Sequence, residues 1–392
     1  MKWLTRPALV AIAIIGIAGS TAGVAQADPP PGVPRHKAAR VCTEVPAHFA
    51  RCHALVRVDD GGITPQLTAG PAGFGPSDIH GAYNLASASG NGRTVAVVDA
   101  YDDPTAAADL ATYRSQFGLA PCTTASGCFT KVGQTGSSTA LPQVDAGWAQ
   151  EISLDLDMVS ATCPDCKILL VEAKSASFAD LGTAVNYAAS VPGVVAISNS
   201  YGGNDSAAKP AYNHPGIAIT ASTGDSGYGV ESPASFGTVT AVGGTSLVKN
   251  ASARGWSESA WSSAGSGCST INAKPAWQTA ATRCSGKANA DVSAVADPNT
   301  GVAVYDSTPS QGSAGWMVFG GTSASAPIIA AVYALSGNTA GVPASYTWAH
   351  AANLYDVTSG TNGNCTTAVW CTSGAGWDGP TGLGTPNGTG AF

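Results

Sequence analysis

The chain has 392 residues, which is enough for one large domain or two ordinary ones, and 48 of them are glycine. Only 11% of the residues are charged, and the formal net charge at pH 7 is -7. A basic face for nucleic acid is therefore not expected.

The amino-terminal segment, residues 1–27, has the pattern of a secretory signal peptide. Lys2 and Arg6 give it a positive start, an apolar run covers 8–18, and Ala25-Gln-Ala27 offers a small-residue cleavage site. The apolar run is short for a transmembrane helix. A retained membrane anchor is the alternative interpretation. We expect export to the extracellular space and no membrane attachment after cleavage.

The ten cysteines of an exported chain should be mostly paired. They fall into close couples, and pairing in sequence order is the simplest expectation, although spacing alone does not determine connectivity. The couples are Cys42/Cys52, Cys122/Cys128, Cys163/Cys166, Cys268/Cys284 and Cys365/Cys371. The Cys-Pro-Asp-Cys couple also has the spacing of a redox or half-zinc site, but no second such couple accompanies it, so we expect a structural clip.

Residues 28–73 are proline-rich and lack apolar periodicity, which indicates a short amino-terminal arm or a propeptide remnant. From residue 74 onward, helices and strands alternate. Helices are predicted over 76–83, 104–117, 146–161 and 178–189, and strands over 93–99, 167–171, 194–198, 217–221 and 239–242. Continuous apolar runs of this length are typical of strands covered on both faces. The pattern predicts one α/β domain over 74–392, with a doubly wound, mostly parallel sheet flanked by helices.

The stretch Phe319-Gly-Gly-Thr-Ser-Ala-Ser-Ala-Pro327 precedes an apolar segment that predicts a helix to about Leu335. Glycines let a backbone approach a substrate closely. Ser323 would stand where the helix begins, where the positive helix end favours developing negative charge. The pattern therefore indicates a nucleophilic serine. The alternative is that this glycine- and serine-rich segment only caps the helix.

A nucleophilic serine needs a base, and histidine is the usual one. None of the six histidines lies in a sequence typical of such a base. The predicted helix 146–161 instead carries Glu151 and Asp155, and this i, i+4 spacing places both carboxylates on one face, with Cβ atoms roughly 5–6 Å apart. Two such carboxylates tend to share one proton and titrate as a unit. The pair is a candidate general base in acid, although alone it would indicate a solvated helix face.

Asp225 lies in the segment Gly224-Asp-Ser-Gly227, shortly after the predicted strand 217–221. Loops at the carboxyl ends of strands hold ligands in open α/β sheets. A protonated aspartate can donate a hydrogen bond to an oxyanion, which requires acid or a raised pKa. The same segment is similar to the nucleophile region of chymotrypsin-like proteases, which would make Ser226 catalytic. That family needs an all-β double barrel and a histidine in another context, and the chain offers neither.

Together these segments resemble the sedolisin family of serine-carboxyl peptidases, whose fold resembles that of subtilisin. The resemblance covers roughly residues 74–392. It implies that Ser323 is the nucleophile, that Glu151 is its general base, and that Asp155 hydrogen-bonds to Glu151 and orients it. It further implies that Asp225 is the acid of the oxyanion hole.

The resemblance also implies a substrate-binding strand and two departures from the family pattern. Ser200 and Gly202, in the segment Ser-Tyr-Gly-Gly, would belong to the strand that pairs with the backbone of a peptide substrate. Tyr201 stands where the family often has tryptophan, so the extended hydrogen-bond network and the subsites are expected to differ. Residues 28–73 are too few for the large folded prodomain of family members, so inhibition before export is expected to work differently.

Two glycine-rich segments near the carboxyl end resemble the calcium site of the family. By this resemblance Asp356 and Asp378 would supply carboxylate oxygens, and Val357, Gly374 and Gly376 would supply backbone carbonyls. Hard oxygen ligands of this kind suit one structural Ca²⁺ ion. The alternative is a glycine-rich loop around the last disulfide.

The sequence thus predicts a secreted, monomeric serine-type endopeptidase that hydrolyses bonds of protein or peptide substrates in acid through a Ser-Glu-Asp triad. One alternative is a subtilisin-type Ser-His-Asp peptidase that uses Asp99, at the end of the first predicted strand, but the chain offers no suitably placed histidine. The other alternative is an exported binding or scaffold protein that keeps the fold without turnover.

Overall fold

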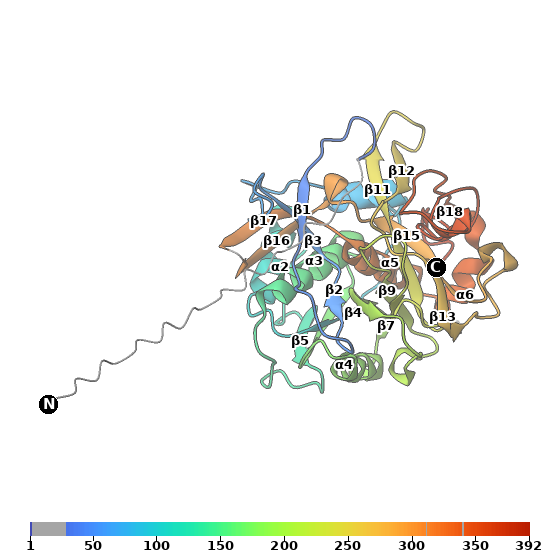
Figure 1. Ribbon diagram of the computed structural model, residues 1–392. Helices are drawn as coiled ribbons and strands as arrows, with labels where there is room; N and C mark the ends of the chain where they lie inside the picture. Colours follow the sequence, from blue (N-terminus) through green and yellow to red (C-terminus); the bar gives the residue numbers. More distant parts are fainter. Residues whose placement is uncertain (2–28, 311, 339–340) are drawn as a thin grey trace.

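The computed structural model describes residue 1 and residues 29–310, 312–338 and 341–392, so the predicted signal peptide falls almost entirely outside the described residues. At its centre is an eight-stranded sheet (Figure 1). The strands are β4 (Thr94–Ala100), β5 (Phe129–Gly133), β6 (Lys167–Ala173), β7 (Val194–Asn199), β9 (Ala218–Ser222), β11 (Thr240–Lys249), β12 (Trp256–Ala260) and β15 (Val292–Val295). Seven of them follow the order β12-β11-β9-β7-β4-β6-β5, and β15 pairs with β11. These pairs are parallel except β11–β12.

Strand β4 lies inside this sheet, between β6 and β7, and its sequence explains that place. Val95 and Val97 belong to one buried core cluster, whereas Ala96 and Val98 belong to the other. A strand that is apolar on both sides can be covered on both faces. The prediction of a mostly parallel sheet flanked by helices is confirmed.

The helices cover the two faces of the sheet unequally. Most buried apolar residues of α1, α2, α3 and α5 belong to one core cluster, and those of α4 belong to another, together with Trp148 of α3. The helices are α1 (Pro76–Tyr83), α2 (Ala106–Gln116), α3 (Ala146–Thr162), α4 (Phe178–Ser190), α5 (Thr322–Ser336) and α6 (Pro343–Ala349). The predicted helices agree with these bounds to within about two residues. The predicted strands are present too, and the last of them extends to Lys249.

Helix α3 is buried along nearly its whole length, although it carries three acidic residues. The Asp145 side chain caps it by accepting hydrogen bonds from the amides of Gly147 and Trp148. The helix packs against α5 and the sheet, so the acids at its centre lie in the interior. The sequence interpretation of a solvated helix face is therefore wrong for Glu151 and Asp155, which have no exposed surface.

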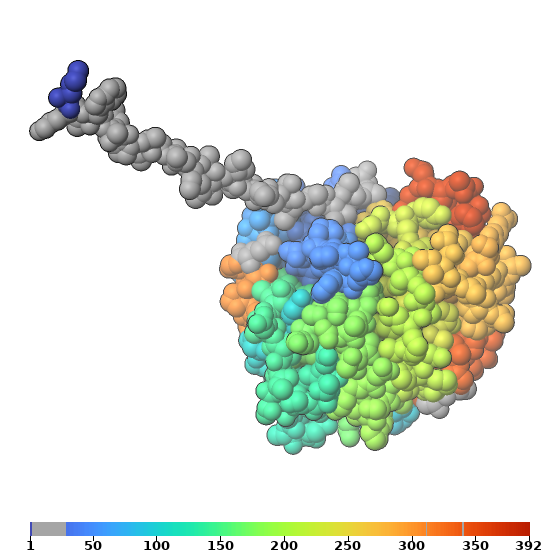
Figure 2. Space-filling view, turned by 60° about the horizontal axis from the view of Figure 1, so that its bottom comes forward, coloured from blue at the N-terminus to red at the C-terminus, as the bar shows by residue number. Residues whose placement is uncertain are grey.

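The amino-terminal arm contributes strands to two smaller sheets. Its strands are β1 (Lys37–Arg40), β2 (Arg51–Cys52) and β3 (Leu55–Val58). β1 and β3 pair with each other and, in the order β1-β3-β17-β16, join a hairpin of β16 (Val302–Ser310) and β17 (Ser313–Gly320). β2 pairs with β8 (Tyr201–Asn204), whose other neighbour is β10 (Glu231–Ser232). In Figure 2 the blue arm lies against green and yellow-green surface from the middle of the chain.

The remaining strands are short or lie apart from the central sheet. They form the antiparallel pairs β13 (Gly267–Ala273) with β14 (Gly286–Asn289), and β18 (Leu354–Tyr355) with β19 (Thr385–Pro386). All five disulfides join the cysteines in sequence order, as predicted. Among the described residues, no helix has the length and apolar character needed to cross a membrane.

Candidate active site

The carboxyl ends of three neighbouring strands, β9, β7 and β4, meet the start of α5 and the middle of α3. Ser200 follows β7, Asp225 follows β9, and Asp99 is close to the end of β4. Ser323 is the second residue of α5. The carboxyl edge of a parallel sheet is where open α/β folds hold their ligands. The sequence-predicted residues Glu151, Asp155, Ser323, Asp225 and Ser200 thus come from separate segments to one buried place.

Ser323 lies at the amino end of α5, where Gly321 precedes the helix with φ +93°. The hydroxyl of Ser323 is fully buried and donates a hydrogen bond of 3.1 Å to the carbonyl oxygen of Ser200. It also accepts one of 3.1 Å from the backbone amide of His53, in the arm. The helix start gives this hydroxyl a positive electrostatic environment.

Glu151 faces the same point from α3. Its Oε2 accepts a hydrogen bond of 2.9 Å from the amide of Ala54, and its Oε1 has no partner among the described residues. Burial, followed by the charges of Asp99 and Asp225, raises the pKa of Glu151 well above its usual value. The nearby Ser323 hydroxyl lowers that pKa, even though it donates its proton to Ser200. Glu151 therefore has an oxygen free to accept a proton.

Asp155 lies one turn further along α3. Both of its carboxylate oxygens accept from the Ser200 hydroxyl, at 2.7 Å. Burial raises the pKa of Asp155 well above its usual value, and the charges of Asp99 and Glu151 raise it further. The charge of Glu151 thus disfavours the charged form of Asp155, its i+4 neighbour.

Asp99 is a third acid of this cluster, and the sequence analysis considered it only within the Ser-His-Asp alternative. It is fully buried, and neither of its oxygens has a hydrogen-bond partner among the described residues. Burial raises the pKa of Asp99 to about 8. An acid directly after an apolar strand was the available signal, since such residues lie at the carboxyl edge of the sheet.

Asp225 is held at the start of α5 by Thr322. Its Oδ1 accepts from the Thr322 amide at 2.8 Å and from the Thr322 hydroxyl at 2.9 Å. Its Oδ2 is buried and has no partner among the described residues. Burial raises the pKa of Asp225, although His53 and Arg40 oppose that rise. The side chain therefore presents one fixed, unsatisfied oxygen.

The arm crosses this site in an extended conformation. β2 pairs antiparallel with β8, with Arg51 opposite Gly202, and the His53 amide donates to the Ser200 carbonyl oxygen at 3.2 Å. The carbonyl oxygen of His53 lies 1.9 Å, and Asp225 Oδ2 2.8 Å, from the position that a Cβ on Gly321 would occupy. Only glycine therefore fits at that position. Ser200 and Gly202, predicted to pair with a peptide substrate, are occupied by the arm.

The imidazole of His53 is fully buried. Its Nδ1 shares a hydrogen bond of 2.7 Å with the Ser222 hydroxyl, and its Nε2 lies 2.9 Å from Oε2 of Glu231. Both ring nitrogens are therefore engaged elsewhere. The ring is not placed as the base of a subtilisin-type Ser-His-Asp triad.

Tyr201 and Ser226 have other partners. The Tyr201 hydroxyl donates to Asn199 at 2.7 Å and shares a hydrogen bond of 3.1 Å with the Tyr212 hydroxyl. Ser226, the residue of the chymotrypsin-like alternative, is exposed, and its hydroxyl accepts from Arg40 at 3.1 Å. Because the fold is α/β with a mostly parallel sheet, the all-β alternative is wrong.

The residues predicted to bind calcium come together around one loop near the carboxyl end. Asp356 Oδ2 accepts from the Gly376 amide at 2.8 Å, and Asp378 Oδ2 accepts from the Gly374 amide at 3.1 Å. Val357 is buried beside Asp356. Carboxylates and backbone carbonyls are the donor types that suit a hard cation, and Oδ1 of Asp378 also accepts hydrogen bonds from Ser373 and Thr381.

A second acidic group was not singled out by the sequence analysis. The carboxylates of Asp103, Asp109 and Asp306 are buried and lie within 4.8 Å of one another. Thr308 donates to Asp103 at 3.2 Å, and burial raises the pKa of Asp306 to about 8.

Comparison with known proteins finds relatives of the chain by sequence. No family model matches it. Kumamolisin from Bacillus sp. (strain MN-32) is 30% identical over 367 residues, covering 82% of this chain and 63% of kumamolisin. Sedolisin from Pseudomonas sp. (strain 101) is 26% identical over 388 residues, covering 86% of this chain and 64% of sedolisin. The chain thus spans less than two thirds of the length of either relative.

Solved structures show the same relationship. Pseudomonas sedolisin, a serine-carboxyl proteinase complexed with two molecules of pseudo-iodotyrostatin, is similar with a TM-score of 0.68 at 25% identity. The similarity covers 81% of this chain and 96% of that one. A lanthipeptide protease with a TM-score of 0.50 at 13% identity shares the fold alone. These similarities support membership of the sedolisin family, and the chain has a subtilisin-like fold.

Proposed function

We propose that the chain is a serine-carboxyl peptidase that hydrolyses peptide bonds in acid, with Ser323 as its nucleophile. The observation that carries this proposal is the course of the arm. The bond between His53 and Ala54 has Ser323 at the His53 amide, Glu151 at the Ala54 amide and Asp225 on the side of the His53 carbonyl oxygen. Acyl transfer needs a nucleophile, a proton acceptor and an oxyanion donor in these relative positions.

In the proposed reaction, Ser323 Oγ attacks the carbonyl carbon of the substrate while its proton moves to Glu151. The carbon–nitrogen bond then breaks, and Glu151 gives the proton to the leaving amine, which leaves an acyl ester on Ser323. Water attacks that ester, loses a proton to Glu151, and the serine takes the proton back as the product acid departs. Asp155 would stabilise the proton on Glu151, since the two acids titrate together.

The proposed acid dependence comes from Asp225. It can donate a hydrogen bond to the oxyanion only in its protonated form. Burial raises its pKa, so the protonated form persists to a higher pH than for an ordinary aspartate. The cluster of Glu151, Asp155 and Asp99 must release one proton before it can accept one, and that first proton leaves without the repulsion of a charged neighbour, which raises the pKa of the acids that ionise later. Activity therefore requires a pH at which the cluster has begun to ionise and Asp225 has not.

We expect casein digestion, measured from pH 2 to 8 with acid-incubated protein, to pass through a maximum below neutrality. Protonation of the cluster removes the base on the acid side, and ionisation of Asp225 sets a negative charge against the oxyanion on the alkaline side. A maximum above pH 7 would contradict the proposal and favour the subtilisin-type alternative. No digestion at any pH would favour the catalytically silent binding protein.

We also propose that the chain is exported and acts as a monomer on protein or peptide substrates, with no role for nucleic acid or membrane. Five disulfides suit an oxidising compartment. Within the described residues the cysteines are all paired. The low content of charged residues offers no basic surface for nucleic acid.

We propose that Asp356 and Asp378, with the carbonyls of Val357, Gly374 and Gly376, hold one structural Ca²⁺ ion. Calcium would neutralise the two carboxylates and fix the loop between them.

If so, a chelator should lower Tm by roughly 3–4 °C relative to calcium at about 100 times its Kd, measured by scanning calorimetry. Magnesium at the same concentration should not restore Tm, because it demands a tighter octahedral site. Asp378→Asn should remove the response to calcium. Identical Tm values with and without chelator would refute the calcium site.

A further inference from the structure

The His53 side chain of the arm occupies a pocket next to the proposed nucleophile. Its ring is fully buried between the Ser222 hydroxyl, at 2.7 Å, and a carboxylate oxygen of Glu231, at 2.9 Å. Ser222 ends β9, and Glu231 begins β10, which pairs with β8. The pocket therefore lies beside β8, the strand that pairs with β2 of the arm, and its two polar groups both contact the His53 ring.

Glu231 has its carboxylate directed at this pocket. Among the described residues, His53 is the hydrogen-bond partner of that carboxylate, and the two form an ion pair when the ring is protonated. The Glu231 side chain is 21% exposed, whereas that of His53 is fully buried. Removal of the arm would thus leave Glu231 as an acid facing the vacated space. Because a buried or half-buried charge is stabilised by a partner of opposite sign, that space favours a cation.

Two glycines make room for the pocket. A Cβ on Gly202 would lie 2.6 Å from Oε2 of Glu231 and 2.6 Å from the ring of His53. A Cβ on Gly224 would lie 2.8 Å from Oε1 of Glu231. Any side chain at these positions would fill the space between the carboxylate and its occupant. Because no side chain stands at these two positions, the carboxylate of Glu231 can contact the side chain in the pocket.

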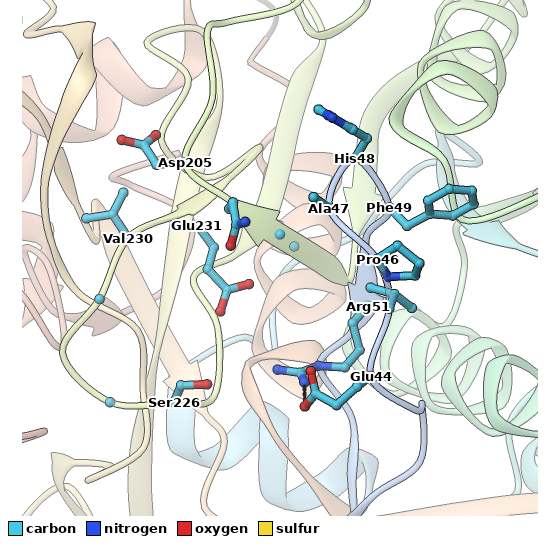
Figure 3. Close-up of a pocket in the computed structure, with 16 residues that line it drawn as sticks. Glu44, Pro46, Ala47, His48, Phe49, Arg51, Asp205, Ser226, Val230 and Glu231 are labelled. Atoms are coloured by element: carbon cyan, nitrogen blue, oxygen red, sulfur yellow. Dashed lines mark hydrogen bonds and ion pairs between the residues drawn. The ribbon is translucent and has the colours of Figure 1, made fainter.

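The arm brings further positive charge to the same acid. The charges of His53, Arg51 and Arg40 together hold the pKa of Glu231 below its usual value, although burial alone would raise it. A cavity of about 310 Å³ lies between Glu231 and the arm. Figure 3 shows Glu231 and Ser226 on one wall and the arm residues Glu44 to Arg51 on the other. Glu231 and Gly202 line this cavity, so the acid that contacts His53 also borders open space.

The direction of the arm identifies which side of a substrate this pocket would contact. The His53 carbonyl lies at Gly321, near Asp225, and the next amide, of Ala54, donates to Glu151. His53 is therefore on the acyl side of the bond that crosses the proposed catalytic groups. We propose that Glu231, together with Ser222, selects substrates with a cationic side chain on the residue whose carbonyl is attacked. This inference rests on the proposed peptidase function.

The test compares peptides that differ only at that residue, with arginine, lysine, histidine, leucine or glutamate there. The enzyme is the full chain after incubation in acid, and kcat/KM is measured for each peptide. We expect wild type to prefer the cationic peptides over leucine by ~10- to 100-fold, the range of a close charge pair. Glu231→Gln, which keeps shape and removes charge, should lose this preference, and Glu231→Lys should favour glutamate.

The outcomes distinguish the proposed peptidase function from the proposed specificity of the Glu231 pocket. Cleavage of none of the peptides by wild type would refute the peptidase function itself. Cleavage without a cationic preference, or an unchanged preference in Glu231→Gln, would overturn the specificity pocket while leaving the peptidase intact. If Glu231→Gln slows arm release without altering peptide preference, Glu231 only holds the arm, and the inference is wrong.

A second series of variants changes His53, the side chain in the pocket, and leaves Glu231 as it is. This series keeps the inference testable if the Glu231 variants fail to fold. Because the bond between His53 and Ala54 lies against the proposed catalytic groups, we expect the chain to cleave this bond itself in acid. His53→Arg should keep that cleavage fast, whereas His53→Leu and His53→Glu should slow it by ~10-fold or more. The readout is the intact mass of the chain against time in acid. Equal rates for the Arg, Leu and Glu variants would overturn the inference.

Discussion

In acid, wild-type protein is expected to cut its own chain between His53 and Ala54, whereas Ser323→Ala stays intact. The arm already presents this bond to Ser323, Glu151 and Asp225, so no further binding step is needed. Removing the nucleophile from such a set of catalytic groups lowers the rate of bond cleavage by about 10⁴- to 10⁶-fold. Intact mass and amino-terminal sequencing should reveal a new terminus at Ala54 in wild type only.

Ser325→Ala is the matched control for this experiment. Ser325 belongs to the same glycine- and serine-rich segment, but its hydroxyl donates at 3.0 Å to the carbonyl oxygens of Ala294 and Val295. This variant should cut itself at a rate close to that of wild type. The rate should also be independent of protein concentration, since the bond lies within the same molecule. Equal cutting of Ser323→Ala and wild type would remove Ser323 from its proposed role.

The second large effect concerns Asp225. Asp225→Ala should lower kcat by about 10²- to 10³-fold, the usual cost of one oxyanion donor. Asp225→Asn should retain much more activity, because its amide oxygen can accept from Thr322 and its nitrogen can donate where Oδ2 now lies. Asparagine does not ionise in this range.

The pH profile distinguishes this role from a structural one. In wild type the alkaline limb reports loss of the Asp225 proton, at a pH above that of an ordinary aspartate because burial raises the pKa. In Asp225→Asn that limb should move to higher pH, while the acid limb, set by the cluster of Glu151, Asp155 and Asp99, stays in place. Casein digestion by the variants at equal folded concentration checks this. An alkaline limb that does not move would show that another group sets it.

Much of the fold could be predicted because its signals are local. Apolar runs define β4, β6, β7 and β9, and Ser323, Glu151 and Asp225 lie in motifs whose residues are close in sequence. Each motif also falls beside a strand end or a helix, where local patterns are strongest. The structure brings these residues together because the sheet order sets adjacent strand ends side by side.

The course of the arm could not be predicted, because no local pattern determines it. Strands β1, β2 and β3 have only two to four residues each, and β2 and β3 pair with partners far along the chain. The burial of His53 depends on Ser222 and Glu231, which are 169 and 178 residues away. The sequence analysis did not assign Asp99 to the acidic cluster for a similar reason: Glu151 and Asp155 are far from Asp99 in sequence and near it only in the fold.

Self-cleavage at Ala54 would also change the four-stranded sheet that contains the arm. β3 lies between β1 and β17, and the cut separates β1 from β3 in the chain. Once the released piece diffuses away, Leu55 to Val58 would become an edge strand with unpaired backbone groups, which invites association with other chains. The strand has only four residues and carries Arg57, and short, charged edges resist such pairing. Association with another chain through this edge is therefore not expected.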